Sequence, residues 1–329
     1  MTSIDEGAVL RAAGDGELEA LRRLLERDRE LANVVGANPY WGGRVQPLHL
    51  AVTWTQEEAV RILLAAGADA SGDNAGYGGW SPLMLAATRG LESIVGLLVD
   101  AGARVGLFEA AALGRARTVA EILAGNPDRA KHVLPDGTTP LHLAATREIA
   151  DLLLEAGAVP TLRDGYGGAP LDAAIARAAR GCGDSEAVAR RLIAAGAEVD
   201  AATYAALGDL EALDAELDRY PDALHELSAR GAAPLHAAAA RGRLNAVRHL
   251  LKRGADPDQR DGEGIRPLHW VTRAPRDDTA IARALLDAGA DPLARDDEHD
   301  ATPAGWAAFQ RRPTLEQLLR EAEERARDL

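Results

Sequence analysis

Short amphipathic stretches with helical spacing follow one another in pairs along this chain. In residues 139–158, a Pro-Leu-His-Leu-Ala-Ala segment supplies one apolar face, and Ile149 and Leu153 lie on the apolar face of a second stretch. Pro140 suits the first turn of a helix, where its missing N–H is not needed. Gly157 suits the left-handed position that ends a helix. The pattern predicts a helix-turn-helix unit whose two helices cannot bury their apolar faces alone.

The same opening and closing signals recur through most of the sequence, with a period of roughly 33 residues. Units of this length stack into solenoids, in which each repeat contacts only its neighbours. The proline openings are Pro47, Pro82, Pro140, Pro170, Pro234, Pro267 and Pro303. The Gly-Ala closings begin at Gly67, Gly102, Gly157, Gly196, Gly254 and Gly289.

These repeated segments resemble the ankyrin repeat. Its motif, Gly-x-Thr-Pro-Leu-His-x-Ala-Ala, is nearly complete in residues 137–145, and a second good match covers residues 234–256. The stretches that begin at Pro47, Pro82 and Pro267 match with one or two departures. The resemblance covers almost the whole chain, and solenoids of this kind usually bind other molecules rather than catalyse reactions.

The resemblance implies an all-α solenoid of stacked helix-turn-helix ankyrin repeats with hairpin finger loops. We expect about ten repeats in a single domain over residues 1–329. The N-terminal capping repeat is expected at about 1–37 and the C-terminal one at about 301–329, where the last helix is dense in Glu and Arg, as a cap that faces water should be.

A three-repeat super-period is superimposed on the basic repeat. Three units lack the proline opening but keep a small-residue first helix and a glycine before the second, at Gly16, Gly114 and Gly208. The same three units also replace the Gly-Ala closing with another ending. Two interpretations stay open: the period records duplication alone, or it has a function.

Composition narrows the expected partners. The formal net charge is −14, which argues against broad binding to nucleic acid or an anionic membrane and favours a monomer. Cys182 is the single cysteine, so no internal disulfide is expected. No secretion signal or long apolar run is recognised, and the sequence therefore predicts a cytoplasmic protein. Arginine dominates the basic residues, and with frequent alanine this suggests a bacterial source.

Aromatic residues beside glycine pairs are the first candidate binding residues. Gly pairs allow tight turns, and Tyr and Trp often dominate binding energy at interfaces. The alternative is that these rings fold back and shield the neighbouring loop. The finger residues concerned are Tyr40, Trp41, Tyr77, Trp80 and Tyr166.

A second candidate row lies at the end of the first helix, a position that lines the concave groove in ankyrin-like proteins. Arginines there would suit an acidic peptide or a small anionic ligand, because guanidinium binds carboxylate and phosphate bidentately. The alternative is that they pair with nearby carboxylates. The row comprises Trp54, Arg89, Arg147, Arg177, Arg241 and Arg311, with Arg273 one place earlier.

Other polar and aromatic residues favour structural roles. The resemblance implies that His49, His142, His236 and His269 hydrogen-bond to loop backbone. Asp172 replaces this histidine in its own repeat. It lies one repeat away from His142, and this distance is too long for the hydrogen bond that an acid–base pair needs. Residues 296–300 form an acidic finger loop, where turn formation is expected rather than metal binding. Trp270 and Trp306 are expected to pack in the core.

The sequence favours a binding adaptor that recognises a protein or peptide through its groove and aromatic fingers. No catalytic motif is visible, so we expect no catalytic residues, metal or cofactor. The main alternative is an enzyme or small-molecule binder that uses the arginine-lined groove for an anionic ligand, with residues 177–188 as a lid. A structural spacer is the third interpretation.

Overall fold

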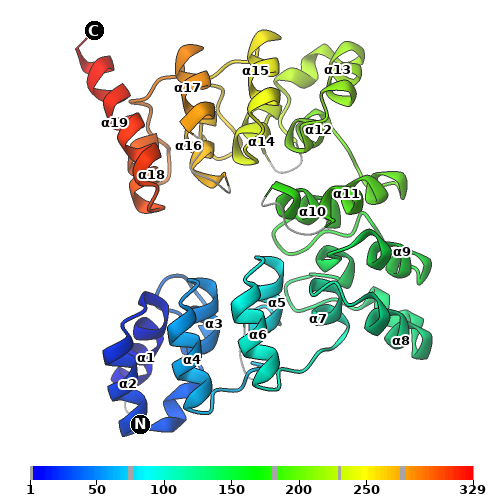
Figure 1. The fold of residues 1–329 in the computed structure, drawn as a ribbon. Coiled ribbons are helices and arrows are strands. Elements are labelled where there is room, and N and C mark those ends of the chain that lie inside the picture. The colour runs from blue at the N-terminus through cyan, green and yellow to red at the C-terminus, as the bar shows by residue number, and fades with distance from the viewer. Residues whose placement is uncertain (1–2, 73–76, 180–183, 229–230, 275–278, 329) are drawn as a thin grey trace. The chain divides into compact units, whose positions relative to one another are not determined.

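The computed structural model describes residues 3–72, 77–179, 184–228, 231–274 and 279–328 as pairs of short helices with one small β-hairpin (Figure 1). The chain divides into two compact units. Unit 1 comprises Met1–Arg177 and Cys182–Ala195, and unit 2 comprises Ala178–Gly181 and Gly196–Leu329. The single solenoid over residues 1–329 stays a prediction. Cys182 and most of the insertion around it lie outside the described residues.

In unit 1, from α1 to η3, the first helices of successive repeats pack against one another, and each also packs against the second helix of its own repeat. Its elements are α1 (Ser3–Asp15), α2 (Leu18–Arg27), η1 (Arg29–Asn33), β1 (Gly36–Ala37), β2 (Arg44–Val45), α3 (Pro47–Thr53), α4 (Glu57–Ala65), α5 (Pro82–Thr88), α6 (Glu92–Asp100), α7 (Leu107–Ala112), α8 (Ala116–Gly125), η2 (Pro127–Lys131), η3 (Pro140–Leu143), α9 (Arg147–Glu155), α10 (Pro170–Ala179) and α11 (Ser185–Ala194). Strands β1 and β2 pair antiparallel, with Gly36 opposite Val45.

Unit 2 repeats the same arrangement of paired helices. Its elements are α12 (Ala201–Leu207), α13 (Leu210–Arg219), η4 (Pro221–Leu224), α14 (Pro234–Ala240), α15 (Leu244–Lys252), α16 (Pro267–Trp270), η5 (Val271–Arg273), α17 (Thr279–Asp287), α18 (Pro303–Phe309) and α19 (Pro313–Arg327). The fold is the predicted all-α arrangement of stacked helix pairs.

Prolines and glycines bound these helices as the sequence predicts. Pro47 and Pro234 stand at the first position of α3 and α14. Gly67 and Gly254 have φ of 95° and 94°, in the left-handed region that glycine adopts without strain. One opening differs, because Pro140 begins the 3₁₀ helix η3 rather than an α-helix. The spacing in this repeat is short and leaves less chain for the first helix.

Small and medium apolar side chains fill the core of each unit. In unit 1, Leu21, Leu63 and Leu98 are fully buried among alanines, and Leu250 and Leu285 are fully buried in unit 2. Alanine allows neighbouring helices to approach closely, which suits a core only one helix pair deep. The low aromatic content of the chain is consistent with this packing.

The three-repeat period recurs as local structure. Gly16, Gly114 and Gly208 have φ of 73°, 73° and 75°. The second helices of these three repeats, α2, α8 and α13, are each followed by a 3₁₀ helix, namely η1, η2 and η4. Asp28 and Asn126 begin the first two of these turns, where their side chains accept hydrogen bonds from the N–H groups two residues later. The altered endings in the sequence thus produce one shared backbone turn.

Candidate partner-binding surfaces

Four predicted site residues of unit 1 form one group of rings, which we call the N-terminal aromatic cluster: Tyr40, Trp41, Trp54 and Tyr77. The Tyr40 and Trp54 ring centroids lie 5.3 Å apart in an edge-to-face contact. Trp41 lies 6.0 Å from Trp54 and 6.5 Å from Tyr77. These separations lie within the range of favourable aromatic pairs. Two finger loops and the end of α3 therefore contribute to one surface.

The two tyrosines anchor this cluster to the protein, and the two tryptophans form its solvent-exposed part. Tyr40 and Tyr77 pack on a small core of Leu10, Val45 and Leu50. The Tyr40 hydroxyl donates a hydrogen bond to Asp15 Oδ1 at 2.9 Å. Burial, and then this hydrogen bond, raise the pKa of Tyr40 above its usual range. Tyr40 and Tyr77 thus shield a small core, as the alternative interpretation expects, whereas binding by the finger aromatics stays a prediction.

The outer part of the cluster faces solvent. Trp41 is 42% exposed and Trp54 is 45% exposed. Within the described ranges, Tyr166 belongs to no such ring group, although its side chain is 84% exposed. Its finger is held instead by Asp164, which accepts a hydrogen bond from the Tyr166 N–H at 2.9 Å. The three fingers are therefore not equivalent.

Trp80, the fifth finger aromatic, ties two loops together. Its indole Nε1 donates to Asp136 Oδ2 at 2.6 Å, although the two residues belong to fingers two repeats apart. Between these two fingers, the connection from α6 to α7 is only a few residues long. The two fingers are close, because a Cβ added at Gly79 would lie 2.5 Å from Pro135 Cδ. This hydrogen bond gives Trp80 a structural role.

The predicted arginine row does not form one continuous ladder. The Arg177 side chain is only 5% exposed, and it donates to His142 O at 2.7 Å and Ala144 O at 2.8 Å. Arg89 donates in the same way to Thr53 O. Both guanidinium groups thus donate to carbonyls of the preceding repeat, and Arg177 is buried whereas Arg89 is exposed. The expectation of a groove arginine is wrong for Arg177, because helix-end carbonyls need donors.

The remaining members of the row differ from one another. Arg147 is exposed and lies 3.7 Å from Asp151, one turn further along α9. Arg241 is half-buried at the end of α14. Arg311 has a φ of 57° and occupies a left-handed turn before α19, where several other repeats have glycine and the repeat of α3 and α4 has Thr55. Arg273, in unit 2, lies over an indole ring.

Two arginines that the sequence analysis did not single out also donate to backbone carbonyls of the preceding repeat, as Arg177 does. Arg243 Nε donates to Ala206 O at 3.0 Å, and Arg312 Nη2 donates to Ala274 O at 2.7 Å. Each stands directly before the second helix of its repeat. An arginine at that position is the signal that could have identified them.

The motif histidines hydrogen-bond to loop carbonyls, as the resemblance implied. The Nε2 distances are 2.9 Å for His49 to Trp80 O, 3.0 Å for His142 to Gly168 O, 3.1 Å for His236 to Ile265 O and 3.2 Å for His269 to Ala301 O. Burial lowers the pKa of His49 to about 4 and also lowers the pKa of the other three. These rings are therefore neutral at neutral pH. Asp172 instead accepts a hydrogen bond from the Ala169 N–H at 2.9 Å.

In unit 2, Trp270 and Trp306 are held by buried carboxylates. Trp270 Nε1 donates to Asp261 Oδ2 at 2.7 Å, and Trp306 Nε1 donates to Asp296 Oδ2 at 2.9 Å. Both indoles are only half-buried, so they are less enclosed than the predicted core role requires. Phe309, three residues after Trp306, is 85% exposed and was missed by the sequence analysis.

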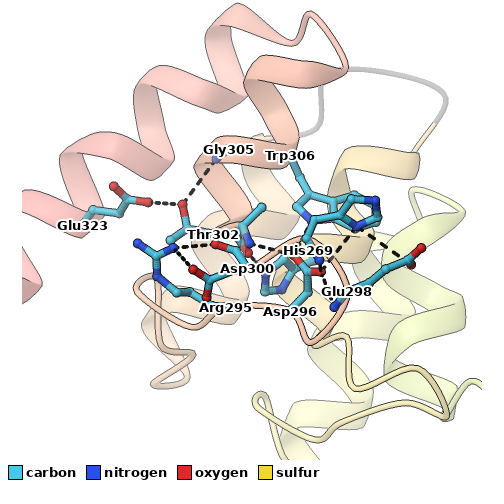
Figure 2. Close-up of polar contacts among 11 residues, drawn as sticks. His269, Arg295, Asp296, Glu298, Asp300, Thr302, Gly305, Trp306 and Glu323 are labelled. Atoms are coloured by element: carbon cyan, nitrogen blue, oxygen red, sulfur yellow. Dashed lines mark hydrogen bonds and ion pairs between the residues drawn. The ribbon is translucent and has the colours of Figure 1, made fainter. Parts of the chain in front are cut away.

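Asp296 organises its finger loop from within (Figure 2). Its carboxylate accepts hydrogen bonds from the N–H groups of Glu298, His299 and Ala301 as well as from Trp306. Burial alone would raise the pKa of Asp296, but these hydrogen bonds outweigh burial and lower it below its usual range. The acidic loop therefore contains one turn-forming carboxylate, as expected for such a loop.

Two further observations concern the chemistry open to the chain. In the described part of the sequence, no group of three or more His, Cys, Asp and Glu side chains is placed to hold a metal ion. No helix among the same residues is both long enough and apolar enough to cross a membrane.

The stacked helix pairs and their finger loops define a helical repeat protein. The family model for ankyrin repeats, which describes three copies, matches residues 9–109, 107–203, 200–296 and 235–328. The chain therefore belongs to the ankyrin-repeat family. Our count of about ten repeats is an overestimate by this measure, since the matches are four overlapping segments.

Several known proteins share parts of this sequence. Mouse ankyrin repeat and SOCS box protein 16 is 33% identical over 166 residues, which cover 47% of this chain and 31% of that protein. Mouse and human protein phosphatase 1 regulatory subunit 27 are each 39% identical over 93 residues, which cover 28% of this chain and 59% of theirs. The chain thus spans less than two thirds of these relatives.

A solved structure is also similar. The human ASB11 ankyrin repeat domain matches with a TM-score of 0.43 and 26% identity, and the match covers 67% of this chain and 98% of that domain.

Proposed function

We propose that this protein is a binding adaptor that recognises a protein or peptide partner, with the N-terminal aromatic cluster as its main contact surface. Ankyrin repeats typically mediate protein–protein interactions, and relatives include proteins named as regulatory subunits of protein phosphatase 1. The observation that carries the proposal is the pair of exposed, mutually contacting indoles of Trp41 and Trp54.

The cluster has the properties of an interface hot spot. Tryptophan and tyrosine contribute large contact areas and dominate many interfaces, where truncation of one costs roughly 2 kcal/mol or more. Tyr40 and Tyr77 are fixed to a small core, and their rings support the two tryptophans. A surface that is already ordered loses little side-chain entropy when a partner binds.

The alternative, an anionic small ligand in an arginine-lined groove, has less support. Arg89 and Arg177 were two of its six arginines, and both donate to backbone carbonyls. With a net charge of −14, we also propose that copies of the chain repel one another and that the protein acts as a monomer.

A bait experiment tests the proposal on the full chain. The wild type and the double variant Trp41→Ala with Trp54→Ala would each be immobilised and incubated with lysate of the source organism, and the captured proteins would be quantified by mass spectrometry. Tyr166→Ala is the matched control, because it removes an exposed aromatic from a finger outside the cluster. Circular dichroism would verify that all three proteins are folded.

We expect the double variant to retain at least 10-fold less of a specific partner than the wild type, and Tyr166→Ala to retain it. A partner captured equally by the double variant would refute the role of the cluster.

A further inference from the structure

We propose that unit 2 has a second recognition surface, independent of the N-terminal aromatic cluster, that binds a carboxylate of an acidic peptide next to a large apolar side chain. We call it the Arg273 platform, and it consists of Trp270, Arg273, Trp306 and Phe309. These residues come from α16, η5 and α18, which lie in two successive repeats.

The two indoles of the platform are fixed in place. Trp270 and Trp306 are tied by their ring nitrogens to Asp261 and Asp296, and both carboxylates are buried. Each indole also has an edge-to-face contact with a motif histidine: Trp270 with His236 at 5.8 Å, and Trp306 with His269 at 6.1 Å. The rings are therefore oriented before any partner binds.

The Arg273 guanidinium lies against both rings. Its Cζ is 4.4 Å from the Trp270 ring centroid and 5.5 Å from that of Trp306. A cation over an aromatic ring is attracted by the charge distribution of the ring, and this contact requires no carboxylate or carbonyl acceptor. The contact thus holds the guanidinium over the two rings, and a guanidinium can still bind a carboxylate bidentately through its planar N–H fork.

These donors have no carboxylate partner within the described ranges of the chain. Asp261 and Asp296, the buried carboxylates that hold the two indoles, are already engaged. Asp261 accepts from the N–H groups of Glu263 and Ile265 as well as from Trp270. An exposed guanidinium in a chain with net charge −14 is thus free to pair with a carboxylate supplied from outside.

Phe309 supplies the apolar part of the platform. It follows Trp306 by three residues in α18, and residues at this spacing share one helix face. Its side chain is 85% exposed. A single exposed apolar residue is ordinary, but Phe309 lies on the same face of α18 as Trp306, whose ring is 5.5 Å from the Arg273 Cζ, so an apolar contact lies beside a charge contact. The matching partner is a peptide with Asp or Glu next to a large apolar residue.

The test uses the full chain and peptides of defined sequence. A random peptide library would be selected on immobilised wild-type protein, and one enriched acidic peptide would be resynthesised together with its amide analogue, in which Asp or Glu becomes Asn or Gln. Affinities for both would be measured by fluorescence anisotropy with the wild type, Arg273→Gln, Arg273→Lys and Phe309→Ala. Arg248→Gln is the matched control, because Arg248 is an exposed arginine on α15 and its replacement removes the same charge.

We expect the wild type to bind the acidic peptide at least 10-fold more tightly than its amide analogue. Arg273→Gln should abolish this preference, Arg273→Lys should restore only part of it because lysine lacks the planar fork, and Phe309→Ala should weaken both peptides about equally. Arg248→Gln should behave as the wild type.

Three outcomes would overturn the proposal. The first is a selection that enriches no acidic sequence, and the second is an equal affinity of the wild type for acid and amide peptides. The third is an unchanged preference in Arg273→Gln. Retention of a DNA oligonucleotide or of phosphatidylserine vesicles by the wild type, in place of the peptide, would also overturn it.

Discussion

The N-terminal aromatic cluster and the Arg273 platform are built from similar residues but held in different ways. In the cluster, Tyr40 is hydrogen-bonded through its hydroxyl, whereas Trp41 and Trp54 rest on other rings with their indoles half exposed. In the platform, buried carboxylates hold the indoles themselves. The comparison teaches that a hydrogen-bonded ring fixes the loop, while the group beside it that lacks such an anchor stays exposed to solvent.

The largest expected effect comes from removing a carboxylate that holds an indole. Asp296→Ala leaves three backbone N–H groups and an indole N–H without their acceptor, and we expect a loss of about 3–4 kcal/mol of stability. Asp15→Ala removes the carboxylate that accepts from the Tyr40 hydroxyl at the surface but leaves the longer hydrogen bond to Arg11 O at 3.4 Å, and we expect a loss of about 1 kcal/mol. Urea unfolding followed by circular dichroism measures both values. Equal losses would show that the two anchors do not differ.

The arginine row gives the next test. Arg177→Met removes a buried guanidinium that satisfies two carbonyls, and we expect a loss of about 2–3 kcal/mol of stability. Arg147→Met removes an exposed pair with Asp151, and we expect about 0.5 kcal/mol or less. Thermal unfolding of both variants checks the difference. If Arg147→Met lost as much stability as Arg177→Met, the distinction between buried and exposed arginines of the row would be wrong.

The histidine contacts predict a dependence on pH. The pKa of His49 is about 4 in the folded protein and about 6.5 when unfolded, so between these values the unfolded chain binds more protons. Stability should therefore fall as the pH falls from 6.5 towards 4, by at most about 3 kcal/mol from this group. The same melts repeated on His49→Gln should show a weaker dependence between pH 7 and 5. An identical dependence in the variant would assign the effect to other groups.

Alanine substitutions at one glycine in each of the first two fingers compare these loops, and we expect the smallest losses of stability here. Gly79→Ala places a Cβ against Pro135 at a positive φ, and we expect a loss of about 2 kcal/mol. Gly43 also has a positive φ, but a Cβ there would meet no atom within 4 Å, so Gly43→Ala should cost about 1 kcal/mol. Differential scanning fluorimetry can measure both shifts in Tm. A larger decrease in Tm for Gly43→Ala would show that the contact of residue 79 with Pro135 does not determine the loss of stability.

Much of the fold could be predicted because its signals are local. Pro47 and Gly67 bound helices through backbone geometry that depends only on their own residue type. The repetition of such signals predicted the stacked pairs, and the motif position of His49 predicted its bond to a loop carbonyl.

The candidate sites could be predicted only in part, because their contacts join repeats. Tyr40 and Trp54 belong to different segments, and the sequence predicted each as a candidate without predicting their contact. The pairing of Trp80 with Asp136 joins fingers two repeats apart, and no local pattern indicates it. Arg89 and Arg177 looked alike in sequence to Arg147, but their environments differ.

The sequence by itself determined that this protein is an array of ankyrin repeats, where its helices begin and end, and which residue types its fingers present. Only the tertiary structure decided which of those side chains are exposed and which are held by hydrogen bonds to other repeats. The physical reason is that helix ends and turns are set by a few neighbouring backbone angles. Whether a guanidinium or an indole is free depends on acceptors that the next repeat brings within hydrogen-bond distance.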